Sequence, residues 1–346
     1  MEIEVHPISE RTWFMHLLLI LLRPFKPNLV KPPSPTKLKS SLEFSINHSP
    51  KLQIPNSVKK KCVVSEKSIN DIWCYDLCYR DSLRVKGDEI GNVEKKDRML
   101  YFCGGGFQAP PSSQHWSFVI ELARKLPHMN ITVISYPLAP FTNASKAIPA
   151  LVDLYKEISI ESQRSDEDIH LGGDSSGGNI ALSLTLQLLS ISSMASDQVK
   201  EIKLPKSLIL ISPVVDCSNS NPEMREIDKL DPVLSVKYTG QVAEKWRGGD
   251  QVSGLDPLVS PLKCGQEVLL KLKENGIIVN GIVGTWDVLS LDTMKLIDRL
   301  KALNIKGSWY IGQGQMHCFP LAWRYGLGNS ERAKDWVIDT IRKSSM

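Results

Sequence analysis

From about residue 70 onward, apolar and polar residues follow two different patterns, one typical of strands and one typical of helices. Short, continuously apolar runs, which are typical of buried strands, occur at 99–103, 131–136, 169–171, 208–215, 277–283 and 307–311. Between and after them lie segments with apolar residues at helical spacing, at 116–126, 147–158, 179–189, 288–303 and 331–342. Such alternation predicts an α/β fold with a mostly parallel central sheet that helices cover on both faces. In these sheets the active site lies at the carboxyl ends of the strands.

The first 60 residues follow a different pattern. Ten nearly all apolar residues run from Trp13 to Leu22, and residues 24–58 are rich in proline and serine. The apolar run is too short to span a membrane, which takes about 20 residues, and its flanks do not suit a cleaved signal peptide. Two interpretations stay open for it: an anchor that lies in a membrane interface, or a helix that caps the active site. We expect residues 24–58 to form an extended connector to a catalytic domain over 61–346.

Composition excludes some classes of protein. Hydrophobic residues make up 42% and charged residues 23%, which allows a large buried core. A net charge of +4 is too small for the basic face of a nucleic-acid-binding protein. The seven scattered cysteines show no zinc-site spacing and favour a reducing compartment. Sequons at Asn47, Asn130 and Asn143 favour the endoplasmic reticulum instead. The sequence therefore leaves the localisation open between the endoplasmic reticulum membrane and the cytoplasm, and it leaves the oligomeric state open as well.

The most specific chemical motif is the GDSSGG segment at 173–178, which matches G-x-S-x-G between a predicted strand and a predicted helix. A sharp turn at this place lifts a nucleophile out of the sheet, and the helix N-terminus favours negative charge beside it. The glycine spacing centres on Ser175, which we predict as the nucleophile, with Ser176 as its competitor. The alternative interpretation is a glycine-rich turn that binds phosphate.

Three successive glycines, Gly104, Gly105 and Gly106, follow the strand that ends at Cys103. Because glycines carry no side chain, their N–H groups can point into a cavity. Together with the N–H of Ser176 they would form an oxyanion hole for acyl transfer. The alternative interpretation is a flexible turn.

A serine nucleophile needs a histidine base and a carboxylate that orients this base. Among the seven histidines, His317 alone follows the last predicted strand, whereas His170 lies inside a strand and His115 is placed to line a pocket. Asp287 follows the penultimate predicted strand and is the candidate acid, with Asp292 as the runner-up. The order Ser, Asp, His is that of α/β-hydrolases and differs from that of chymotrypsin-like proteases.

The combined motifs resemble the hormone-sensitive-lipase group of α/β-hydrolases, the α/β-hydrolase fold-3 esterases, over roughly residues 98–345. This family's GDSAGG, YRLAPE, S-P-L, D-x-L and H-x-F motifs match this sequence at 173–178, 136–140, 260–262, 287–289 and 317–319. The resemblance implies an α/β-hydrolase fold and a serine carboxylic-ester hydrolase that needs no metal or organic cofactor. A finer similarity, to fungal steryl acetyl hydrolases, implies a deacetylase of lipid metabolism at the endoplasmic reticulum membrane. A related branch contains secondary-metabolite esterases.

The sequence also departs from the family pattern. Cys103 stands where the family has the histidine of its HGGG motif, which supports the loop and is not a triad member, so we expect activity to persist. Pro137 and Phe141 replace an arginine and a glutamate and thereby remove a structural ion pair.

One long segment, at 217–263, separates two strand signals. It predicts a helical cap insertion, with an ordinary crossover as the alternative. A different function class is a non-catalytic ligand-binding receptor or a scaffold on the same fold. Retention of His317 favours the enzyme over the receptor, which we would expect to lack this histidine.

Overall fold

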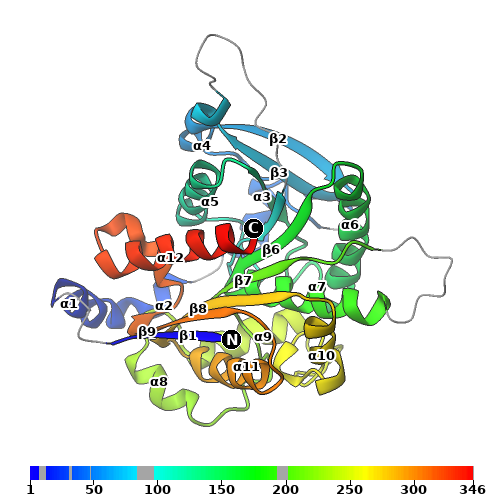
Figure 1. Cartoon of the computed structure of the whole chain (residues 1–346). Helices are drawn as coiled ribbons and strands as arrows, with labels where there is room; N and C mark the ends of the chain where they lie inside the picture. The colour runs from blue at the N-terminus through cyan, green and yellow to red at the C-terminus, as the bar shows by residue number, and fades with distance from the viewer. Residues whose placement is uncertain (8–12, 31–32, 47, 84–96, 193–201, 346) are drawn as a thin grey trace.

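A nine-stranded sheet runs through the molecule (Figure 1), in the spatial order β1-β9-β8-β7-β6-β4-β5-β3-β2. The structure is a computed structural model that describes residues 1–7, 13–30, 33–46, 48–83, 97–192 and 202–345, so the Asn47 sequon lies outside the described residues. In chain order the strands are β1 (Glu2–His6), β2 (Cys62–Ile69), β3 (Ile72–Tyr79), β4 (Asp97–Phe102), β5 (Met129–Ser135), β6 (Asp168–Asp174), β7 (Ser207–Ile211), β8 (Ile278–Trp286) and β9 (Ser308–Met316).

Neighbouring strands from β1 through β5 in this order pair in parallel, and only the β5–β3 and β3–β2 pairs are antiparallel. The predicted α/β fold with a mostly parallel sheet is confirmed. The sequence analysis did not predict β1 or the β2–β3 hairpin. β1 lies at the sheet edge beside β9, although the two are separated by almost the whole chain.

Helices cover both faces of the sheet. Met99 and Tyr101 of β4 face one core cluster, whereas Leu100 and Phe102 face the other, as the two-residue period of a strand requires. One face carries α6, α7, α10 and α11, and the other carries α4, α5 and α12. Their bounds are α4 (Asn56–Lys61), α5 (Ser113–Lys125), α6 (Ala144–Arg164), α7 (Ser176–Ser192), α10 (Gln266–Glu274), α11 (Ser290–Ala302) and α12 (Gly328–Ser345).

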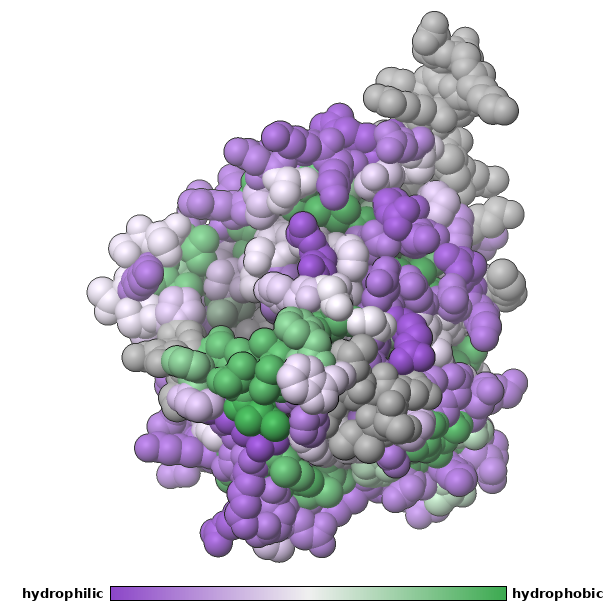
Figure 2. Space-filling model, turned by 90° about the vertical axis from the view of Figure 1, so that its left-hand side faces the viewer, coloured by the Kyte–Doolittle hydropathy of each residue, from purple (hydrophilic) through white to green (hydrophobic). Residues whose placement is uncertain are grey.

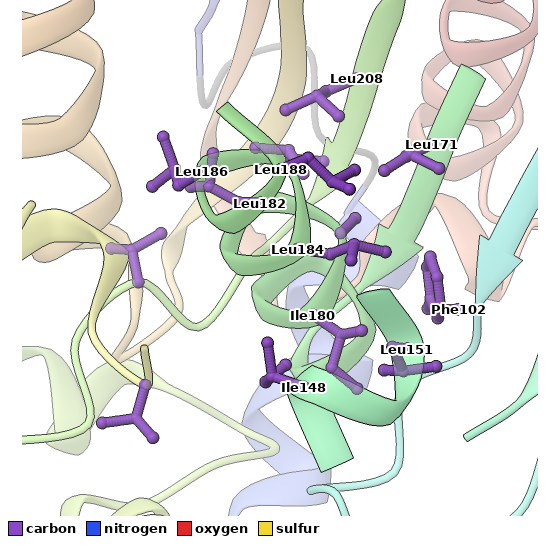
Figure 3. Packing of buried hydrophobic residues seen from close by; sticks show 14 of the residues in the cluster. Phe102, Ile148, Leu151, Leu171, Ile180, Leu182, Leu184, Leu186, Leu188 and Leu208 are labelled. Carbon is purple, nitrogen blue, oxygen red and sulfur yellow. The ribbon is translucent and has the colours of Figure 1, made fainter. Parts of the chain in front are cut away.

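The helix that follows the GDSSGG segment, α7, is buried between the sheet and α6. Figure 3 shows Leu184 and Leu188 on the side of α7 that faces Leu171 and Leu208 of the sheet, with Ile180 close to Ile148 of α6. Because α7 has apolar contacts on several sides, its first turn is held rigidly at the end of β6.

Two segments complete the molecule at the carboxyl end of the sheet. The expected cap segment contains α8 (Met224–Leu230), α9 (Val236–Arg247) and the short 3-10 helix η4 (Pro261–Lys263). The N-terminal apolar run forms α1 (Trp13–Leu22), and the expected extended connector contains η2 (Arg23–Phe25), α2 (Lys26–Leu29) and α3 (Pro35–Ser41). Within the described ranges, no helix has the length and apolar character to cross a membrane.

One predicted strand is shorter than expected. The apolar run 208–215 is a strand only as far as Ile211, because Ser212 has a positive φ of 44° and Pro213 has no N–H for the ladder. The chain turns there, and the N–H of Val214 donates to the carbonyl of Ser175. Residues after β7 therefore support the predicted nucleophile instead of extending the sheet.

Candidate active site

Ser175 stands on the turn between β6 and α7, in a conformation that few residues other than glycine adopt. Its φ is +52°, which is strained for a residue with a side chain. The surrounding backbone holds it there: its N–H donates to the carbonyl of Ile211 at 2.9 Å, and its own carbonyl accepts from Asn179 at 3.2 Å. Ser175 lines a cavity at this end of the sheet.

The two glycines of the motif are required by close backbone contacts. A Cβ atom on Gly173 would lie 2.4 Å from the backbone carbonyl of Gly177, and one on Gly177 would lie 1.8 Å from the carbonyl oxygen of Phe102. Neither space can hold a side chain, so the G-x-S-x-G spacing is a packing requirement of this turn.

Asp287 and His317 meet at the ends of β8 and β9. The Nδ1–H of His317 donates to Oδ2 of Asp287 at 2.8 Å, and Oδ1 of Asp287 accepts the N–H of Leu289 at 2.9 Å. The two strands come together here because Gly284 has no side chain: a Cβ on it would lie 2.3 Å from the carbonyl oxygen of Gln315. Asp287 is fully buried, so its carboxylate fixes the ring and tautomer of His317.

Burial and the charge of Asp287 shift the pKa of His317 in opposite directions. Burial alone would lower the pKa of His317, but the Asp287 carboxylate and Cys318 raise it well above its ordinary value. The free ring nitrogen, Nε2, lies 3.4 Å from the Sγ atom of Cys318. Burial raises the pKa of Cys318 to about 11, so it remains a neutral thiol, and its sulfur can accept a hydrogen bond from Nε2 of the protonated ring. Among the described residues no hydrogen bond joins Ser175 Oγ to His317.

A buried network holds Asp174, the residue before the predicted nucleophile. Asp174 accepts from Nε2 of His115 at 3.0 Å and from the hydroxyl of Tyr101 at 3.0 Å. The Nδ1 atom of His115 accepts the N–H of Ser112 at 2.9 Å, which leaves Nε2 as the donor. Burial opposes ionisation of Asp174, but His115, the N–H of Gly104 and Tyr101 together lower its pKa. Asp174 thus ties the glycine loop and α5 to the nucleophile turn.

The glycine loop presents its later N–H groups toward the cavity. Gly105 and Gly106 have φ values of 144° and 60°, which suit glycine, and both line the cavity with Ser175. No protein acceptor among the described residues takes the N–H of either glycine. The N–H of Gly104 faces Asp174 instead. Ser176 begins α7, where helix N–H groups have no partner within the helix.

The cavity above these groups has a volume of about 760 Å³ and is walled mainly by apolar side chains. The sheet supplies its polar floor, and α9, α1 and α2 supply its apolar walls. The apolar lining includes Phe14, Leu18, Leu22, Leu29, Val30, Val214, Leu234, Tyr238, Val242, Leu289, Leu321 and Ala322.

The competing candidates from the sequence lie elsewhere. Ser176 is buried, with its Oγ atom 3.4 Å from the hydroxyl of Tyr136. Asp292 accepts from Asn221 of the cap segment at 3.0 Å and pairs with Lys295. His170 is buried in β6, 2.8 Å from the hydroxyl of Ser207.

Cys103 carries a free thiol but is not among the residues that line the cavity. It is buried beside the glycine loop, and burial raises its pKa well above the ordinary value. Its carbonyl accepts the hydroxyl of Tyr136 at 2.8 Å. The loop is therefore supported here by Tyr136 and, through Asp174, by His115.

Sequence reasoning missed Asp231, a buried carboxylate in the cap segment. It accepts the N–H groups of Val233 and Leu234, which line the cavity, and that of Val288, which follows Asp287. Burial, together with the nearby charge of Asp287, raises the pKa of Asp231 to about 7. No sequence motif marks it, because its role arises from a contact between segments more than 50 residues apart.

Comparison with known proteins agrees with the observed fold. An esterase of Acinetobacter venetianus is 31% identical over 179 residues, which are 51% of this chain and 55% of that protein. The chain thus matches only about half the length of that relative. Carboxyl esterase 2 of the fungus Tuber melanosporum has the same fold, with a TM-score of 0.74 at 16% identity over 97% of this chain and 100% of that one.

A further structural neighbour is an esterase from the bacterial hormone-sensitive lipase family, with a TM-score of 0.70 at 18% identity over 95% of this chain and 97% of that one. The family model described as alpha/beta hydrolase fold matches residues 99–321, which carry the nucleophile turn, the glycine loop and the Asp287–His317 pair. This chain therefore belongs to the α/β hydrolase fold family.

Proposed function

We propose that the protein is a serine carboxylic-ester hydrolase with Ser175, His317 and Asp287 as its catalytic triad. The observation that carries this proposal is the 2.8 Å bond between His317 and the buried Asp287, because His317 lines the same cavity as Ser175, a strained serine on a strand-to-helix turn. The named esterase relative supports the same reaction class.

In the first half of the reaction, Oγ of Ser175 attacks the ester carbonyl while Nε2 of His317 takes its proton. The thiol of Cys318 must give way to the serine hydroxyl as hydrogen-bond partner of Nε2, and such bonds often form only when substrate binds. Asp287 stabilises the imidazolium. The N–H groups of Gly105, Gly106 and Ser176 would bind the oxyanion, whereas Gly104 would hold the loop through Asp174.

In the second half, the imidazolium of His317 protonates the departing alcohol, and the acyl group remains on Ser175 as an ester. Water then attacks this acyl-enzyme with His317 again as the base. Collapse of the second tetrahedral intermediate releases the acid and restores the serine hydroxyl.

The shape of the cavity supports a small acyl group and a large hydrophobic alcohol. Next to the glycine loop the space is narrow, because a Cβ on Gly106 would lie 3.0 Å from the hydroxyl of Tyr238 and 3.2 Å from Val242. Away from this point α1 and α2 add apolar side chains to the walls of the site. Acetyl esters of bulky apolar alcohols, such as steryl acetates or secondary metabolites, fit this description.

Ser175→Ala tests the reaction class. We expect the variant to lose nearly all hydrolysis of p-nitrophenyl acetate, on the order of 10⁶-fold in kcat, and to lose labelling by a fluorophosphonate probe. Ser176→Ala is the matched control and should keep both. If the wild-type protein took no fluorophosphonate adduct, a ligand-binding or scaffold role on this fold would be favoured instead. A panel of acetyl, long-chain and steryl esters then tests the substrate class.

A further inference from the structure

The first helix, α1, presents apolar side chains on two sides. Phe14, Leu18 and Leu22, spaced by four residues, line the cavity. Trp13, Leu17 and Leu21 form a second row at the same spacing, and their exposed fractions are 77%, 39% and 57%. We call the exposed apolar residues of this region the α1 patch: Trp13, Phe14, Leu17, Ile20, Leu21, Phe25 and Leu29.

This patch is continuous with the mouth of the cavity. Phe14 and Leu29 both line the cavity and are about half exposed, at 58% and 46%. Figure 2, which views the side of the molecule that carries α1, shows green side chains gathered into one patch there. Contiguous apolar surface of this kind marks an interaction site, because water contact with it is unfavourable.

Charge indicates what covers the patch. From Arg11 to Leu42 the sequence has six Lys and Arg residues and no Asp or Glu, whereas acidic residues slightly outnumber basic ones in the rest of the chain. Two segments of this kind in two copies would repel each other, which disfavours a self-association interface. The helix α1 itself has no Lys or Arg. Lys26 is paired with Asp228, but the segment around the helix keeps a positive net charge, which attracts anionic lipid headgroups while the apolar row inserts between them.

Polar contacts hold α2 in its place beside the cap. Lys26 donates to the backbone carbonyl of Asp228 at 2.8 Å and also pairs with its carboxylate. Leu19, a buried residue of α1, packs against Ala322 and Leu327. The segment is therefore attached to the body on one side, which leaves its opposite apolar row available.

We propose that the α1 patch docks on an anionic lipid surface and that hydrophobic esters pass from this surface into the cavity along α1. The sequence left two interpretations open for Trp13 to Leu22, a membrane anchor and a cap of the active site. In this proposal one side of α1 serves as the anchor and the other side as the cap. The docking part does not depend on catalysis, whereas the passage of esters rests on the proposed hydrolase function.

Vesicle flotation tests the docking part. We expect the full chain to float with vesicles of equal parts phosphatidylcholine and phosphatidylserine, and less with phosphatidylcholine alone. Raising the salt to about 1 M shortens the Debye length to ~3 Å. Binding to the phosphatidylserine-containing vesicles should then fall to the level seen with phosphatidylcholine alone. Ser175→Ala should float like the wild type, which separates docking from hydrolysis.

Variants of the second, outward row of α1 (Trp13, Leu17 and Leu21) test whether the α1 patch is the surface that binds lipid. Trp13→Ser and Leu21→Asp should each lower vesicle partitioning by about tenfold or more, because each removes one inserted apolar side chain. Turnover of soluble p-nitrophenyl acetate should not change, since neither residue lines the cavity. Leu255→Asp, at a site that is 60% exposed in the cap segment, is the control and should float normally.

The passage of esters is measured with a long-chain ester carried in the same vesicles. Leu21→Asp should lose turnover of this ester and keep turnover of the soluble one. Absence of wild-type flotation with the mixed vesicles, or equal flotation of both α1 variants and wild type, would overturn the docking proposal. A concentration-dependent dimer that Leu21→Asp abolishes, without vesicle binding, would assign the patch to a second copy instead. Should the α1 variants misfold, the lipid and salt dependence of the wild type decides.

Discussion

The floor of the cavity is polar and hydrogen-bonded, whereas its outer wall is apolar and partly exposed. The floor consists of turns at the carboxyl ends of β6, β8 and β9, where Asp174, Asp287 and His317 are buried and each has a hydrogen-bond partner. The outer wall consists of α1 and α2, whose contribution to the cavity is apolar and partly exposed. A fixed floor suits bond-making steps that require accurate geometry, whereas an apolar wall without directional bonds accepts varied hydrophobic groups. We therefore expect floor substitutions to act on kcat and wall substitutions to act on substrate preference.

Among the floor residues that support the proposed nucleophile, the largest effect should follow from Asp287, the proposed acid. Asp287→Asn keeps the size of the side chain but removes the charge that fixes the His317 tautomer, and kcat for p-nitrophenyl acetate should fall on the order of 10⁴-fold. Asp292→Asn is the matched control, because Asp292 bonds to Asn221 and not to His317. Comparable losses in both variants would contradict the assignment of Asp287 as the triad acid.

The hydrogen bond between His115 and Asp174, next to Ser175, should contribute to the free energy of unfolding. His115→Phe leaves the buried Asp174 without one of its donors and should lower the free energy of unfolding by about 2–3 kcal/mol, measured by urea denaturation. Because the pKa of Asp174 is lowered in the folded protein, its stabilising contribution is present above its unfolded value of about 3.9 and is lost as pH falls further. The wild-type advantage over His115→Phe should therefore shrink in acid. Ser113→Ala, exposed on the same helix, should change stability by less than about 0.5 kcal/mol.

The wall should control specificity with smaller effects. Leu18→Ala removes apolar contact from the cavity and should raise KM for a long hydrophobic ester roughly tenfold, with little change for p-nitrophenyl acetate. Leu17→Ala, the preceding residue on the outward row, is the control and should leave both soluble substrates unchanged. If Leu18→Ala lowered kcat equally for the long ester and for p-nitrophenyl acetate, the wall would affect the chemical step as well as substrate preference.

The pH profile sharpens the description of the floor. His317 must be neutral to accept a proton, and its pKa is raised by Asp287, so kcat/KM should begin to fall at a higher pH than the value of about 6.5 for an ordinary histidine. The stabilising contribution of the His317–Asp287 pair has the opposite sign: it is fully present below about 6.5 and is lost as pH rises through the raised pKa. Activity and this part of the stability should thus change in opposite directions with pH.

The smallest effect should come from the thiol beside the base. Cys318→Ala removes a contact that raises the pKa of His317, so the acid limb of the profile should move slightly toward lower pH. We expect kcat at its plateau to change by less than about fivefold, which corresponds to about 1 kcal/mol. Loss of activity as large as that of Asp287→Asn would mean that Cys318 takes part in the reaction.

Local sequence patterns determined much of this protein. The alternating apolar runs predicted the parallel sheet and its helices. The G-x-S-x-G motif located the tight turn that carries Ser175, because the backbone contacts of Gly173 and Gly177 admit no side chain. The placement of Asp287 and His317 after strands followed from the rule that parallel strands end at one edge. These features depend on short stretches of chain, so a sequence can display them.

Tertiary structure decided what depends on segments that are far apart. The bonds of Asp231 to the loop after Asp287, the contact of Cys318 with His317, and the pairing of β1 with β9 have no local signal, since each depends on how distant elements pack. The same holds for α1, whose sequence showed only an apolar helix. Packing of the body against one side of that helix is what makes one row a cavity wall and leaves the other exposed.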